Sequence, residues 1–170
     1  DTSDDWIKSR TGISQRRISG LNDNVCNMGY KAALAALEMA NWGIETIDLI
    51  ILATSTPNDL FGSAPNIQAK LGAKNAVAFD LTAACSGFLF AAITASQFLK
   101  GGSYKRAIVI GSDQLSSYVD WNDRRSCILF GDGAGAIAIE ATNKFDNLIG
   151  FNMRSDGKRG SFLNLPSKNN

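Results

Sequence analysis

Cys85 has the sequence context of a reactive nucleophile. It lies in the segment AFDLTAACSGFLFAA, where an apolar stretch typical of a buried strand leads through small residues into an apolar stretch typical of a helix. Free N–H groups and the positive end of the helix dipole favour an anion there, and so favour the thiolate form of a cysteine. The same N–H groups can stabilise the oxyanion that forms when a thiolate attacks a carbonyl. Cys85 is therefore the candidate nucleophile; on this context alone, a buried structural cysteine is the alternative.

The other two cysteines lack such a setting. Cys26 falls in the first turns of a predicted helix and Cys127 at the start of a predicted strand, so both are interpreted as structural. The three cysteines are far apart and form no CxxC pair. An odd number of unpaired cysteines predicts reduced thiols, and we expect a cytoplasmic protein.

The sequence contains no histidine. This count excludes, within these residues, a Ser-His-Asp triad, a Cys-His pair and any His-ligated metal site, so we expect no metal. Lys and Arg number 17 against 16 Asp and Glu, which gives a net charge of +1 and argues against a nucleic-acid partner. Apolar runs such as 88–93 are too short to cross a bilayer, so we expect no membrane insertion.

Arginines near a tryptophan form a second group of candidates. Arg10 would lie one helical turn from Trp6, beside its flat aromatic face, and Arg124 is adjacent to Arg125. Guanidinium groups bind phosphates through forked contacts, so this group could bind a nucleotide's base and phosphates. A solvated surface is the alternative.

The glycine-rich segment FGDGAGAIAIE, residues 130–140, is the third candidate. It resembles a phosphate-binding loop, but it precedes a predicted strand instead of opening a helix, and it lacks the Lys-Ser/Thr pair. We interpret it as a tight turn with close backbone packing.

Helices and strands, predicted from the spacing of apolar residues, must position these candidate residues. Helices are predicted after the caps Ser3, Asp23 or Asn24, and Ser63, ending at Gly12, Gly43 and Gly72, with a fourth over 86–100. Strands are predicted over 47–54, 76–81, 107–111, 128–130, 134–140 and 148–153. The strand, helix and strand over 76–111 predict a crossover between parallel strands. The alternation predicts one α/β domain over residues 1–170, with a strand order that the sequence leaves open.

Several of these segments, in order, resemble the β-ketoacyl-acyl carrier protein synthase III family of the thiolase superfamily. They are DTSDDWIKSRTGISQRRI at the start, AACSGF around Cys85, GSD at 111–113, FGDGAGA from Phe130 and SDG at 155–157. The resemblance implies a duplicated, layered αβαβα fold and a homodimer. Residues 1–170 would supply most of the first, N-terminal half-fold, lacking its opening strand and the second half.

The resemblance also implies roles for individual residues. Cys85 would take the acyl group from a coenzyme A thioester. Trp6 and Arg124 would lie on either side of the adenine, and Arg10 and Thr11 would make neighbouring coenzyme A contacts.

Four further positions are implied to form the substrate pocket. Ser55, Leu115 and Phe130 would line the site of the primer acyl group, and Phe61 would reach into the partner subunit's site. Two positions depart from the family pattern. Arg125 stands where a small residue is usual, which predicts an altered coenzyme A fit, and Ser14 stands where a basic residue is frequent, which predicts a weaker electrostatic contact.

The implied reaction is a decarboxylative Claisen condensation that starts fatty acid synthesis without a permanently bound cofactor. The Cys85 thiolate would accept the acetyl group of acetyl-coenzyme A, and decarboxylated malonyl-acyl carrier protein would attack it to give a 3-oxoacyl product. The family's carbanion-stabilising His and Asn come from the second half-fold.

Two alternatives stay open. A related condensing enzyme could make polyketides, quinolones or hydroxymethylglutaryl-coenzyme A, although Trp6 and Arg124 argue against the first and the last of these. This chain could also be an inactive structural half-fold, because alone it would expose a large apolar face.

Overall fold

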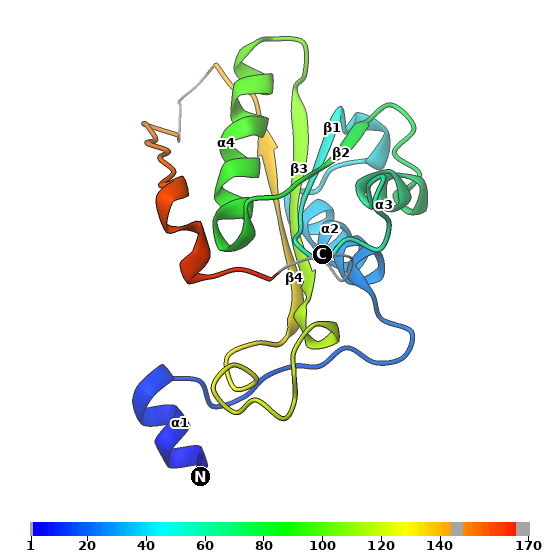
Figure 1. Cartoon of the computed structure of the whole chain (residues 1–170). Helices are drawn as coiled ribbons and strands as arrows, with labels where there is room; N and C mark the ends of the chain where they lie inside the picture. The colour runs from blue at the N-terminus through cyan, green and yellow to red at the C-terminus, as the bar shows by residue number, and fades with distance from the viewer. Residues whose placement is uncertain (1, 144–147, 166–170) are drawn as a thin grey trace.

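The computed structural model of this chain describes residues 2–143 and 148–165, and it is built around one mixed four-stranded sheet (Figure 1). The strands are β1 (Leu49–Ala53), β2 (Val77–Leu81), β3 (Arg106–Gln114) and β4 (Asp132–Glu140), in the order β2-β1-β3-β4. β1 pairs in parallel with β2 and β3, whereas β4 runs antiparallel to β3. The predicted domain also includes Asp1, residues 144–147 and residues 166–170, which lie outside the described residues.

Helices cover both faces of this sheet. Helices α2 (Val25–Ala40) and α3 (Ala64–Leu71) lie on one face, and α4 (Gly87–Lys100) lies on the other (Figure 1). Alternate strand residues point to opposite faces, so Ile50 and Ile108 pack toward α2 and α3, while Ile51 and Val109 pack toward α4. All five residues of β1 are buried, as predicted for a strand that is covered on both sides.

The predicted crossover between parallel strands is confirmed, and the structure adds the strand order. α4 connects β2 to β3, which run in the same direction but are separated in the sheet by β1. Such an order depends on contacts between distant segments, which a local pattern does not contain.

Short side chains and left-handed residues define the helix ends. Helix α1 (Asp4–Thr11) begins after Ser3, whose hydroxyl accepts a hydrogen bond from Trp6 N, and it ends at Gly12, which has φ +72°. Of the two candidate caps of α2, Asn24 is the one used. The predicted end of α2 at Gly43 is wrong, because Asn41 adopts the left-handed conformation and ends the helix earlier.

Helix α3 begins after Ser63, as predicted, but the Ser63 side chain does not cap it. Ser63 itself has helical backbone angles, and its hydroxyl accepts a hydrogen bond from Asn58 N at 2.9 Å. The N–H groups of Ser63 and Ala64 are bound instead by the carboxylate of Asp80, on β2, at 2.6–2.9 Å. A carboxylate from a neighbouring strand therefore replaces the local cap.

Two predicted strands are wrong. Residues 128–130 form no strand; Ile128 is buried in a small cluster with Ile7 of α1 and Cys127. Residues 148–153 are exposed for the most part and pair with none of the described strands. An apolar run becomes a strand only where a neighbour supplies backbone hydrogen bonds. None of the described helices is both long and apolar enough to cross a bilayer.

Candidate active site

The candidate residues gather at one edge of the sheet. Because β1, β2 and β3 are parallel, their carboxyl ends meet there, and the antiparallel β4 begins there. Ser55 follows β1, Cys85 follows β2, Leu115 follows β3, and Asp132 is the first residue of β4. Ligands of open α/β sheets bind at this kind of edge.

Cys85 is exposed at the start of a helix, as its sequence context predicts. It lies in a single 3₁₀ turn (Ala84–Ser86) that leads directly into α4. Ala84 adopts φ +46°, a left-handed conformation that is strained for a residue with a side chain. The alternative of a buried structural cysteine is wrong for Cys85. It is correct for Cys26 and Cys127, which are both buried.

A cavity of about 280 Å³ lies in front of Cys85. Its lining includes Phe88 of α4, Gly111 of β3 and Gly133 of β4. A Cβ on Gly111 would lie 3.1 Å from the Phe88 ring, so glycine allows the strand to approach the helix closely at this point. Small residues thus make up much of the lining next to the sulfur.

Cys26 is chemically different from Cys85. Its thiol lies 3.6 Å from the carbonyl oxygen of Ser63, to which it donates a hydrogen bond. Burial raises the pKa of the Cys26 thiol, so the reactive thiolate is disfavoured. This contrast leaves Cys85 as the cysteine suited to nucleophilic chemistry.

Asp113 holds the loop that carries Ser55. Its carboxylate accepts hydrogen bonds from Ser55 N at 2.7 Å and from the hydroxyls of Thr54 and Thr56 at 3.2 and 3.1 Å. The Thr56 hydroxyl in turn accepts a hydrogen bond from Gln114 N. The ends of β1 and β3 are therefore tied together beside the cavity.

A second cavity, of about 680 Å³, contains two of the predicted pocket residues. Ser55 and Phe61 both line it, and Phe61 is fully exposed. The other two predicted pocket residues, Leu115 and Phe130, are partly buried and line neither of these two cavities. The structure thus places the four residues at the same edge of the sheet without joining them in one hollow.

The candidate nucleotide-binding residues lie on α1 and on the loop before β4, which Figure 1 shows beside each other beyond the end of the sheet. The guanidinium of Arg10 lies 4.3 Å from the centre of the Trp6 ring, within cation–π range. Arg124 donates two hydrogen bonds, of 2.8 and 2.6 Å, to the hydroxyl of Thr2. The hydroxyl of Thr11 donates to Ile7 O and accepts from Ile13 N, so it is bound within the helix end.

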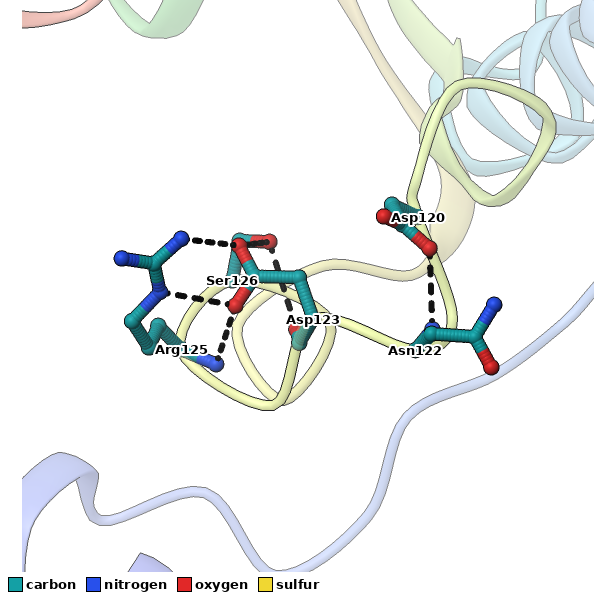
Figure 2. A network of polar contacts seen from close by, with 5 residues as sticks. All are labelled: Asp120, Asn122, Asp123, Arg125 and Ser126. Carbon is teal, nitrogen blue, oxygen red and sulfur yellow. Dashed lines mark hydrogen bonds and ion pairs between the residues drawn. The ribbon is translucent and has the colours of Figure 1, made fainter.

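Arg125, one of the two departures from the family pattern, is held within its own loop. Figure 2 shows its guanidinium and backbone N–H directed at Asp123, with bonds of 2.9–3.3 Å. These hydrogen bonds, from the side chain first and the backbone second, lower the pKa of Asp123 to about 2. The carboxylate is therefore charged at neutral pH, and Ser126 donates to it as well. Ser14, the other departure, is exposed.

Sequence reasoning missed the three aspartates at this edge. Asp80, Asp113 and Asp132 each accept hydrogen bonds from a segment that is distant in the sequence. Part of the sequence signal for these aspartates was present, because Asp113 lies in the segment GSD and Asp132 in the segment FGDGAGA. Their hydrogen-bond partners are fixed only by the folded chain.

The chain closely matches known proteins. Residues 79–157 match the family 3-Oxoacyl-[acyl-carrier-protein (ACP)] synthase III. The chain is 86% identical over 170 residues to the beta-ketoacyl-[acyl-carrier-protein] synthase III of Prochlorococcus marinus strain MIT 9515, and 65% identical over 171 residues to that of strain MIT 9313. All of this chain is aligned in both cases, with 51% and 50% of the relatives. The chain is therefore similar over its whole length to about half of a 3-oxoacyl-acyl carrier protein synthase III.

Solved structures of this family share the fold. A synthase III from Thermus thermophilus matches 98% of this chain and 52% of its own, with a TM-score of 0.91 and 33% identity. One from Pseudomonas aeruginosa PAO1 matches 98% of this chain and 52% of its own, with a TM-score of 0.89 and 37% identity. These matches confirm the predicted thiolase-like α/β fold class, with about half of the synthase III fold in this chain.

The priming beta-ketosynthase of the R1128 polyketide pathway is also similar, with a TM-score of 0.81 and 35% identity over 83% of this chain and 42% of its own. The chain spans about half the length of the curated synthase III relatives it matches. The similarity thus concerns about half of those proteins, and the reaction of the whole protein is inferred below.

Proposed function

We propose that residues 1–170 form one half-domain of an acyltransferase that condenses acetyl-coenzyme A with malonyl-acyl carrier protein and so starts fatty acid synthesis. The observation that carries the proposal is the exposed Cys85 at the start of α4, facing a cavity at the carboxyl edge of the sheet. Similarity to synthase III proteins supports the same chemistry.

The proposed reaction has two halves. The Cys85 thiolate attacks the acetyl carbonyl, the carbon–sulfur bond to coenzyme A breaks, and coenzyme A leaves as its thiol. Malonyl-acyl carrier protein then loses carbon dioxide, its carbanion attacks the acetyl carbonyl, and the Cys85 thiolate leaves. The positive end of α4, beside Cys85, is suited to stabilise the oxyanion that forms in each of the two attacks. Coenzyme A thioester is a substrate here, and no resident cofactor is required.

The proposed coenzyme A site consists of Trp6, Arg10, Thr11 and Arg124. Trp6 remains 37% exposed and Arg10 adds positive charge beside its ring, which suits a base and its phosphates. Thr11 has its hydroxyl bound within the helix end, so any contact from it would require a shared hydrogen bond. The primer pocket would comprise Ser55, Leu115 and Phe130.

We further propose a cytoplasmic homodimer. β2 is an edge strand of the described sheet, so one side of its backbone is available for pairing with a second copy. Phe61 lies nearby in the cavity beside β2 and is fully exposed. A large aromatic side chain in this position is suited to insertion into a partner subunit.

The deciding assay offers the full-length protein acetyl-coenzyme A with either malonyl-acyl carrier protein or malonyl-coenzyme A. We expect a 3-oxoacyl product with the carrier-protein substrate and at least about tenfold less with malonyl-coenzyme A. Product formed preferentially from malonyl-coenzyme A would instead support a related condensing enzyme, of which the R1128 priming ketosynthase is a structural neighbour.

A structural half-fold without activity of its own is the second candidate for the isolated 170 residues. Exposed apolar side chains of α4 favour it, because Leu89 is 65% exposed and Phe98 is 38% exposed. The chain also contains no histidine to stabilise a carbanion. Expressed alone, it is expected to self-associate and to form no condensation product in the same assay. A monomer in size-exclusion chromatography with full condensing activity would refute this expectation.

A further inference from the structure

Asp132 joins three segments of the chain that are distant in sequence. Its carboxylate accepts hydrogen bonds from the backbone N–H and hydroxyl of Ser19, at 2.8 and 2.7 Å. It accepts two more from the backbone N–H and hydroxyl of Ser116, at 2.9 and 2.6 Å. Gln114 donates to the Ser19 hydroxyl as well, at 2.7 Å. This cluster ties β4 to the turn after β3 and to residues 12–20, which we call the arm.

The charge on Asp132 strengthens the cluster. Burial of its carboxyl raises the pKa, but the hydrogen bonds from Ser116 and Ser19 together lower it more, so the net pKa lies below the usual value. A folded-state pKa below the unfolded one means that the stabilisation is present at neutral pH and is lost only as the pH falls through the folded pKa. Hydrogen bonds to an ionised acceptor are about twice as strong as neutral ones.

Backbone packing fixes the arm at the same place. Asp132 N donates to the carbonyl oxygen of Arg17 at 2.7 Å. A Cβ on Gly131 would lie 2.9 Å from that same oxygen, so the approach leaves no space for any other residue. The guanidinium of Arg16 donates to Ile128 O at 2.7 Å. Gly131 and Asp132, at the start of the glycine-rich segment, therefore hold the arm in place by backbone contact with Arg17.

The two sides of this cluster carry different halves of the proposed site. The arm leads directly from α1, which bears Trp6 and Arg10. On the other side, Gly131 and Gly133 flank Asp132 and line the cavity in front of Cys85. We propose that Asp132 is a positioning residue, which holds the arm and α1 so that coenzyme A bound there reaches Cys85. This inference rests on the proposed function.

The test compares Asp132→Asn and Ser19→Ala with Asp48→Asn in the full-length protein. Asparagine keeps the size of Asp132 but removes its charge, and Ser19→Ala removes the hydroxyl that donates to Asp132 and accepts from Gln114. Asp48 is the matched control, because it also accepts two backbone hydrogen bonds, from Lys105 and Arg106, but lies at the opposite end of the sheet.

For Asp132→Asn we expect amides of residues 12–20 to exchange with deuterium about tenfold faster, and the Kd for coenzyme A by calorimetry to rise by about tenfold. Acetylation of Cys85 at saturating acetyl-coenzyme A should change less than about threefold. Ser19→Ala should shift both quantities in the same direction by a smaller factor, and Asp48→Asn should shift neither.

An unchanged Kd in Asp132→Asn would overturn the proposal, whether or not the arm exchanges faster. A Kd that rises equally in Asp48→Asn would also overturn it, because the effect would then be general destabilisation. Failure of the proposed function is distinguishable from these outcomes, because the wild-type protein would then neither bind coenzyme A nor become acetylated.

Discussion

Replacing Cys85 by alanine is expected to abolish acetyl transfer and to lower condensation by at least about 10³-fold in the full-length protein. The sulfur is the nucleophile of the proposed reaction, and alanine has no atom that can form the acyl intermediate. Wild-type protein incubated with acetyl-coenzyme A should gain the mass of one acetyl group, and peptide mass spectrometry should place that group on Cys85. The Cys85→Ala variant should gain none.

The two buried cysteines provide the controls for this experiment. Cys26→Ala and Cys127→Ala should keep the acetyl adduct on Cys85, because both thiols are enclosed and burial raises the pKa of Cys26. An adduct that moves to Cys26 or Cys127, or a Cys85→Ala variant that still condenses, would show that the exposed thiol at the start of α4 is not the nucleophile.

The sequence predicts the position of Cys85 at the start of a helix because its setting is local. The residues around it contain the end of a strand, the small residues of the turn and the first residues of α4, and these determine both its exposure and the N–H groups beside it. The same holds for the caps of α1, where Ser3 and Gly12 act within one turn of their own positions. Such features can be predicted because all the residues that form them are neighbours in the sequence.

Features that depend on distant segments are not predictable in this way. Asp80, 17 residues from Ser63, supplies the carboxylate at the start of α3. Ile128 was expected in a strand because it is apolar, yet it is buried against Ile7, on a helix near the other end of the chain. Apolar character predicts burial, but it does not reveal which partner the residue will be buried against.

The proposed coenzyme A site combines a local feature with one that depends on distant segments. Trp6 and Arg10 are one helical turn apart and were paired correctly from spacing alone. Arg124 instead bonds to Thr2, just before α1, and its loop lies against α1 because Ile7 packs with Cys127 and Ile128. Nucleotide binding by these residues stays a prediction, and the tertiary contacts determine how α1 and the loop before β4 are placed.

Removing the Trp6 ring is expected to weaken coenzyme A binding by about 5- to 150-fold, since stacking of a base on an aromatic side chain contributes about 1–3 kcal/mol. Arg10 covers part of the ring at 4.3 Å, and 37% of the residue remains exposed for a base. Calorimetry with coenzyme A should show this loss in the Trp6→Ala variant of the full-length protein. Trp6→Phe should retain an intermediate affinity, because a smaller ring still stacks.

Trp42→Ala is the matched control for this prediction, because the guanidinium of Arg106 lies 4.9 Å from the centre of the Trp42 ring in a similar pair. That pair lies at the end of the sheet opposite Cys85, where Arg106 begins β3. Folded Trp42→Ala protein should bind coenzyme A as the wild type does, with thermal unfolding used to verify that it is folded. Equal losses in the two variants would trace the effect to stability, and wild-type affinity in Trp6→Ala would place the adenine elsewhere than on α1.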